Sequence, residues 1–140
     1  MNTLVDTSVW SLALRRQPKD LTAAERRVVS ELADLTREGS ARIIGLIRQE
    51  LLSGIRTAAQ YEKLRAALRA FPDEPIDTTD YELAAGVSNA CRAKGITASV
   101  VDALICQIAL SRKWSIFTTD PDFENYAKAL PIRLHTPRAT

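Results

Sequence analysis

The sequence is poor in the residues that build disulfide scaffolds and zinc sites. It has two cysteines and a single histidine, His135. Cys91 and Cys106 form no C-x-x-C motif, lack the spacing of metal ligands and fall in helical patterns. We therefore expect both to be small buried residues, and we expect neither a disulfide framework nor a His-rich zinc site.

Long apolar stretches are also missing. No segment approaches the roughly 18 consecutive apolar residues of a membrane span, and no basic stretch followed by an apolar run resembles a secretory leader. Internal repeats, low-complexity segments and interdomain linkers are absent as well. We expect a cytoplasmic protein without a membrane anchor, folded as one domain over residues 1–140.

The charge is nearly balanced, with 26% charged residues and a net charge of +2. Most of the cations are arginines, which suit bidentate contacts with phosphate. Basic pairs such as Arg15-Arg16 could line a nucleic-acid surface, although arginine is also common on solvated helices. On composition alone, solvated helix surfaces are the favoured explanation of these arginines.

Apolar runs and helix signals alternate along the chain. Thr22 and Glu25 predict a capping box, and Gly39 the end of the same helix. Strands are expected at 3–6, 41–45, 74–77, 114–119 and 131–135, and helices at 7–16, 21–39, 46–55, 58–72, 78–95, 99–113 and 121–130. This alternation predicts an α/β fold, with a parallel sheet covered by helices on both faces.

Acidic residues stand where predicted strands end. Asp6 interrupts the apolar run "LVDTSVW", and Glu50 and Asp120 follow later strands directly or by one helical turn. Binding sites of open α/β sheets form beyond the carboxyl ends of the strands. Asp6 could simply cap the next helix, but Thr7 and Ser8 could cap it equally well.

Asp102 lies in a helix that is apolar on nearly all sides. It shares a stripe with Cys106 and Ala109, so we expect it to be buried. A buried ionised carboxylate is costly unless it is paired or binds a metal. The alternative is a structural ion pair or a capping bond, for which Ser99 is the more natural residue.

The other acids have ordinary explanations when taken singly. Glu50 suits a solvated helix surface, and Asp120, before Pro121, suits a helix opening with Asp122 in its first turn. Together, however, clustered carboxylates repel one another and need a cation. Oxygen ligands favour Mg²⁺ or Mn²⁺, and the natural chemistry is metal-assisted attack of water on a phosphodiester.

Four motifs in this order carry a family resemblance: "LVDTSVW", "RQELLSGIR", "SVVDALICQIAL" and "IFTTDPDF". With them the chain resembles the PIN-domain ribonucleases, specifically the VapC toxins of toxin–antitoxin pairs. The resemblance implies a three-layer α/β/α sandwich with a mostly parallel central sheet. It also implies a set of site residues: the catalytic and metal-binding acids Asp6, Glu50, Asp102 and Asp120, the further acid Asp122, and nearby hydroxyls on Thr7, Thr118 and Thr119.

The same resemblance implies an activity and partners. The activity is Mg²⁺- or Mn²⁺-dependent endonucleolytic cutting of structured RNA, such as transfer or ribosomal RNA. The partners are a second copy of the chain, forming a homodimer, and a small VapB-like antitoxin that covers the acidic site. At the rim of that site we expect Arg15, Arg48 and Arg56 to hold phosphates.

Two alternatives compete with this interpretation. An aspartyl-phosphate phosphatase of the haloacid-dehalogenase type also begins with an aspartate after its first strand. Such an enzyme needs a second aspartate two residues later, where this chain has Ser8. A non-catalytic RNA- or protein-binding domain is the other alternative, and the presence of all four acids argues against it.

Overall fold

The computed structural model describes residues 1–139 and has a small parallel sheet at its centre. The sheet has three strands in the order β2-β1-β3, with β1 at Thr3–Val5, β2 at Ala41–Arg42 and β3 at Ser115–Phe117. The helices are α1 (Thr7–Leu14), α2 (Ala23–Arg37), α3 (Gly45–Leu52), α4 (Ala58–Leu68), α5 (Thr78–Ala93), α6 (Val100–Arg112) and α7 (Asp122–Ala129), with a 3₁₀ turn at Pro18–Asp20.

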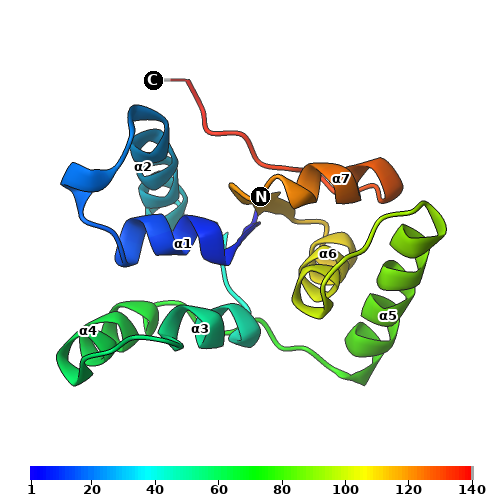
Figure 1. Cartoon of the computed structure of the whole chain (residues 1–140), viewed down its shortest axis with the longest axis horizontal. Coiled ribbons are helices and arrows are strands. Elements are labelled where there is room, and N and C mark those ends of the chain that lie inside the picture. Colours follow the sequence, from blue (N-terminus) through cyan, green and yellow to red (C-terminus); the bar gives the residue numbers. More distant parts are fainter. Residues whose placement is uncertain (140) are drawn as a thin grey trace.

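Helices cover both sides of this sheet. Helices α1 to α4 lie on one side and α5 to α7 on the other (Figure 1). The order of elements and the parallel pairing of β1 with both neighbours confirm the predicted α/β fold. The protein is nevertheless mostly helical, because its strands are only two or three residues long.

Two of the predicted strands do not form. Residues 74–77 contain no strand, and an isolated bridge joins Ile43 to Asp73 just before them. Pro75 has no amide hydrogen to donate to a ladder, which explains why pairing stops there. Residues 131–135 run beside β3 but make one isolated bridge, Ile116 with Leu134. Pro131 likewise limits pairing at the start of this segment.

The core explains the apolar sequence around Asp6. Leu4 and Val5 have no exposed surface, and Trp10 is 1% exposed. The Trp10 indole donates a hydrogen bond to the Val5 carbonyl at 2.9 Å, so α1 is fixed against the end of β1. Cys91 and Cys106 are buried and free, as the sequence predicted.

Local helix signals are confirmed where the chain is exposed. Thr22 and Glu25 form the predicted capping box of α2, and Gly39 adopts a φ of +71° just after that helix. This left-handed conformation is one that glycine adopts without steric cost. Within residues 1–139, none of the helices has the length and apolar character needed to cross a membrane.

Candidate functional site

Asp6 occupies the junction between β1 and α1. Its side chain is not a helix cap, although the residue stands at the N-cap position of α1. Instead, Asp6 Oδ2 accepts hydrogen bonds from the hydroxyls of Ser8, at 3.0 Å, and Thr118, at 2.7 Å. Asp6 is buried, with 7% of its surface exposed. The capping explanation offered by the sequence is therefore wrong for the carboxylate.

Thr118 joins the ends of the two central strands. Val5 of β1 is paired with Phe117 of β3, so the residues that follow both strands emerge side by side. The Thr118 hydroxyl donates to Asp6 and accepts from the amide of Asp120 at 3.0 Å. Asp6 and Asp120 therefore lie at the same edge of the sheet, as a parallel sheet requires.

Three carboxylates form a close cluster beside Asp6. Asp102, Asp120 and Asp122 each place one carboxylate oxygen within 4.8 Å of the others. Asp102 comes from the first turn of α6, where its amide donates to the Ser99 hydroxyl at 3.0 Å. The amide of Asp122 donates to Asp120 Oδ1 at 2.9 Å. We call these three residues the acidic cluster.

The burial of these acids differs from the sequence prediction. Asp102 was expected to be the buried acid, but it is only partly buried, and Asp6 is the more enclosed. Residues 103–109 of α6 are all buried, and Gln107 is the one polar residue among them. Asp102 lies one residue before that stretch, in the first turn of α6, beside the acids of the sheet edge.

The electrostatics of Asp102 reflect a crowded acidic environment. Burial raises the pKa of the Asp102 carboxyl, a hydrogen bond from Tyr126 partly opposes this, and the charges of Asp6 and Asp120 raise it further. The net pKa lies above the ordinary value of an aspartate. The protein itself therefore disfavours the charged form of Asp102, which a bound cation would favour.

Tyr126 is a contact that sequence reasoning missed. Its hydroxyl donates to Asp102 Oδ2 at 2.6 Å, and the side chain is buried, with 2% exposed. Tyr126 stands four residues after Asp122 on α7, so both share a helix face. That spacing was the available signal, but a tyrosine at helical spacing is usually a core residue.

Glu50 lies outside the acidic cluster and contacts Thr7, the residue next to Asp6. Its Oε1 accepts a hydrogen bond from the hydroxyl of Thr7 at 2.9 Å, and its side chain is exposed. Thr7 directly follows Asp6, which places Glu50 at the solvent side of the same edge. Thr119 donates its amide to the Ser8 hydroxyl at 3.0 Å.

The arginines predicted for the rim differ in their contacts. Arg48 pairs with Asp73 at 2.9 Å and donates to the carbonyls of Leu68, at 3.0 Å, and Phe71. Its guanidinium thus fastens α3 to the end of α4 and the segment that follows. Arg15 and Arg56 are exposed.

The site differs from other acids of the protein in its ion pairs. Across residues 1–139, neither Asp6, Glu50 nor the acidic cluster makes an ion pair with lysine, arginine or histidine. Elsewhere, Arg112 pairs with Asp80 at 2.6 Å and with Glu74 at 2.9 Å. Partly buried carboxylates in close proximity, with oxygen donors only, fit Mg²⁺ or Mn²⁺.

Comparisons with known proteins agree with this fold. A family model described as PIN domain matches residues 3–129. No curated protein matches the chain. FitAcB from Neisseria gonorrhoeae is similar in structure with a TM-score of 0.75 and 21% identity, over 96% of this chain and 97% of that one.

Two further solved structures share the fold. VapBC2 from Rickettsia felis, bound to a promoter DNA fragment, has a TM-score of 0.75 and 14% identity, over 96% of this chain and 98% of that one. A toxin–antitoxin complex from Klebsiella pneumoniae has a TM-score of 0.68 and 16% identity, over 99% of this chain and 100% of that one. At these identities the likeness concerns the fold.

Proposed function

The chain belongs to the PIN-domain family, and from this premise we propose that it is the toxin of a toxin–antitoxin pair and a metal-dependent endoribonuclease. Similar solved structures support the first part, because one is described as a toxin–antitoxin complex and another as a complex with promoter DNA. The acidic edge of the sheet supports the second part.

One observation carries the proposed activity. The acidic cluster brings three carboxylates within 4.8 Å of one another, beside buried Asp6, with no ion pair to a protein cation in residues 1–139. Such an arrangement is costly without a cation. We assign Asp102, Asp120 and Asp122 to hold Mg²⁺ or Mn²⁺, with Asp6 and Glu50 supporting a second metal or the attacking water.

The bound metal would lower the pKa of a water molecule and stabilise charge on the phosphoryl oxygens. The protein's own residues then orient the reactants. Asp6 is held by the hydroxyls of Ser8 and Thr118, so its carboxylate has a fixed position. Glu50 is exposed and oriented by Thr7, which suits a group that holds a water molecule or accepts its proton.

The proposed substrate is structured RNA, such as transfer or ribosomal RNA. Exposed Arg15 and Arg56 are the candidates for holding its phosphates away from the metal. Arg48 is left out of this role, because its guanidinium is engaged with Asp73 and backbone carbonyls. A small antitoxin with a basic residue would complement the unpaired charge of the acidic cluster.

We also propose that the protein forms a homodimer through α5 and the start of α6. A groove of about 320 Å³ is lined by residues of α5 and α6 together with Leu46 of α3, and its lining is mostly apolar but includes Ser88, Asn89 and Arg92. At its edge Tyr81 is 54% exposed and Val100 is 82% exposed. Large exposed apolar side chains beside a groove are typical of interaction surfaces. Light scattering tests this: we expect a dimer for the wild type and a monomer for Tyr81→Glu. A monomeric wild type would contradict the proposal.

The activity is tested by incubating purified protein with transfer and ribosomal RNA in Mg²⁺ or Mn²⁺. We expect cleavage that is lost with a chelator and in Asp6→Asn and Asp102→Asn. Asp34→Asn, on α2, is the matched control and should cut normally. Full cleavage by both site variants would overturn the metal mechanism. Metal binding without cleavage of any RNA would instead favour a non-catalytic binding domain.

A further inference from the structure

The carboxylates at the sheet edge share a pattern of hydrogen bonding. One oxygen of Asp6 accepts from Ser8 and Thr118, one of Asp120 accepts from an amide, and one of Glu50 accepts from Thr7. Each of these donors is neutral. A neutral donor fixes the position of a carboxylate while leaving its charge uncompensated, which is what a metal ligand requires.

Tyr126 supplies the same kind of contact to Asp102, from another element of the fold. Asp102 belongs to α6 and Tyr126 to α7, and the phenol hydroxyl lies 2.6 Å from Asp102 Oδ2. At this distance the bond to an ionised acceptor is short and strong. It therefore ties the first turn of α6 to the helix that carries Asp122.

The phenol ring is held firmly enough to orient its hydroxyl. Tyr126 is 2% exposed, and its ring contacts that of Phe123 edge to face, with centroids 5.1 Å apart and planes at 77°. Phe123 has no exposed surface and directly follows Asp122. Consequently one buried aromatic pair fixes two groups on α7. They are Asp122, a member of the acidic cluster, and the Tyr126 hydroxyl, which donates to Asp102.

Resting on the function proposed above, we propose that Tyr126 is a positioning residue of the metal site. Its hydroxyl holds Asp102 Oδ2, so that the remaining oxygen of Asp102 is presented to the cation at a fixed distance from Asp120 and Asp122. Tyr126 itself is not a ligand. It acts through Asp102, as outer hydrogen-bond partners of metal ligands generally do.

Tyr126→Phe removes the hydroxyl and keeps the buried ring. We expect the dissociation constant for Mn²⁺, measured by electron paramagnetic resonance or calorimetry without RNA, to rise roughly tenfold to a hundredfold. The circular dichroism spectrum should not change. Tyr61→Phe, at an exposed position of α4, is the matched control and should bind Mn²⁺ as the wild type does. Mn²⁺ binding by Tyr126→Phe within twofold of the wild type would overturn the role of Tyr126.

A third variant separates this inference from the proposed function. Asp120→Asn should bind Mn²⁺ much more weakly than the wild type. If Asp120→Asn and the wild type bind equally, no metal site exists here and both proposals fail. If Asp120→Asn loses binding while Tyr126→Phe keeps it, the metal site stands and the role of Tyr126 is wrong.

A measurement on the wild-type tyrosine does not depend on how the Tyr126→Phe variant folds. The chain has three tyrosines, which can be labelled with ¹³C at the ring carbon that bears the hydroxyl. Tyr61→Phe and Tyr81→Phe assign the Tyr126 resonance by elimination. We expect Mg²⁺ to shift this resonance. A cation bound to Asp102 changes the strength of that carboxylate as the acceptor of the Tyr126 hydrogen bond. A Tyr126 resonance that Mg²⁺ leaves in place while Mg²⁺ binds would overturn the proposal.

Discussion

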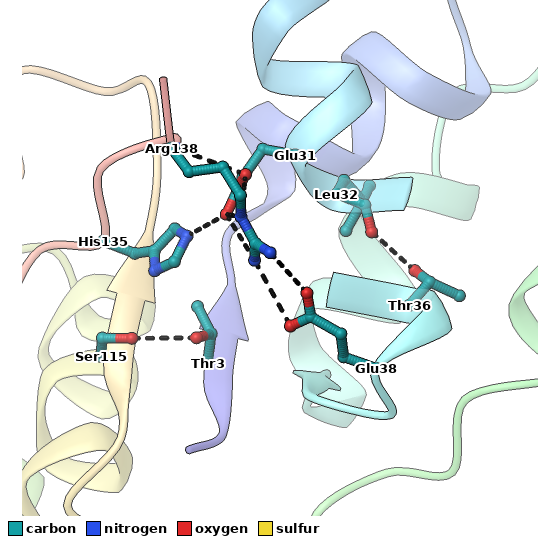
Figure 2. A network of polar contacts seen from close by, with 8 residues as sticks. All are labelled: Thr3, Glu31, Leu32, Thr36, Glu38, Ser115, His135 and Arg138. Atoms are coloured by element: carbon teal, nitrogen blue, oxygen red, sulfur yellow. Dashed lines mark hydrogen bonds and ion pairs between the residues drawn. The ribbon is translucent and has the colours of Figure 1, made fainter. Parts of the chain in front are cut away.

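Two groups of carboxylates in this protein have opposite surroundings. At the sheet edge, the acidic cluster accepts hydrogen bonds from neutral donors. It makes no ion pair with a lysine, arginine or histidine of residues 1–139. On α2, Glu31 is 2% exposed and is bonded to His135 at 2.6 Å and to Arg138 at 3.0 Å. Arg138 also pairs with Glu38 at 2.6 Å (Figure 2). We call this second group the tail network.

The pKa shifts of the two groups run in opposite directions. Burial raises the pKa of Glu31, but hydrogen bonds from His135 and Arg138 outweigh it, and the net pKa is lowered. For Asp102, burial and the neighbouring acids outweigh the bond from Tyr126, and the net pKa is raised. Burial of a carboxylate is thus not in itself a sign of function. The informative feature is whether the chain supplies the neutralising charge.

The tail network has a clear structural task. It fastens the C-terminal segment, which carries His135 and Arg138, onto α2 (Figure 2). His135 is also bonded through its amide to the carbonyl of Ile116 in β3, at 2.7 Å. Both carboxylates of the tail network pair with Arg138 within the chain, in contrast to the acidic cluster. The acidic cluster is left with excess negative charge at a sheet edge.

The largest expected difference between the groups is in catalysis. Asp102→Asn should lower RNA cleavage roughly a thousandfold, because metal-assisted catalysis contributes several kcal/mol. Glu31→Gln should leave cleavage nearly unchanged at a temperature where the variant is folded. Initial rates at saturating Mn²⁺ provide the measurement. Comparable losses in the two variants would mean that the two groups are not functionally distinct.

A second difference is the response of folding stability to metal. At a hundredfold excess over its dissociation constant, Mn²⁺ should stabilise the wild type by about 2.7 kcal/mol. For a domain of this size, that raises Tm by roughly 10 °C. Glu31→Gln should show the full shift and Asp120→Asn a much smaller one, as measured by differential scanning fluorimetry. An equal shift in all three proteins would place the metal elsewhere.

The third difference concerns stability without metal. Glu31→Gln should lower the free energy of unfolding by about 1–3 kcal/mol, because it weakens charge-assisted hydrogen bonds in a buried setting. Asp102→Asn should leave it unchanged or raise it slightly, because the substitution removes repulsion by Asp6 and Asp120. Urea unfolding in the presence of a chelator measures both. Marked destabilisation by Asp102→Asn would show that the native carboxylate is already compensated.

The smallest expected difference is in the pH dependence of stability. Since the folded pKa of Glu31 lies below 4.5, its contribution is full above that pH and is lost as the pH falls through the folded value. The folded pKa of Asp102 lies above 3.8, so its metal-free contribution is full below that pH and is lost as the pH rises through the folded value. Comparing the wild type with each amide variant between pH 3 and 7 tests both signs. Differences that vary in the same direction for the two variants would contradict the comparison.

The sequence predicted which acids meet at the sheet edge better than it predicted the contacts around them. Strand ends pointed to Asp6 and Asp120, and the unbroken apolar helix pointed to Asp102, because both signals are local patterns. The contacts of Tyr126 and Arg48 could not be read in this way, since their partners lie on other elements. The strand predicted at 74–77 also does not form, and here the sequence held the opposing signal, because Pro75 has no amide hydrogen to donate.

The sequence by itself determined the alternation of strands and helices, the caps and the edge of the sheet at which the acids emerge. These features follow from backbone and side-chain chemistry over a few residues. Only the tertiary structure decided which carboxylates are neutralised. Arg138 reaches Glu31 across more than a hundred residues of chain, whereas no cation reaches the acidic cluster within the described residues. Charge compensation depends on distances between elements, and only packing fixes those distances.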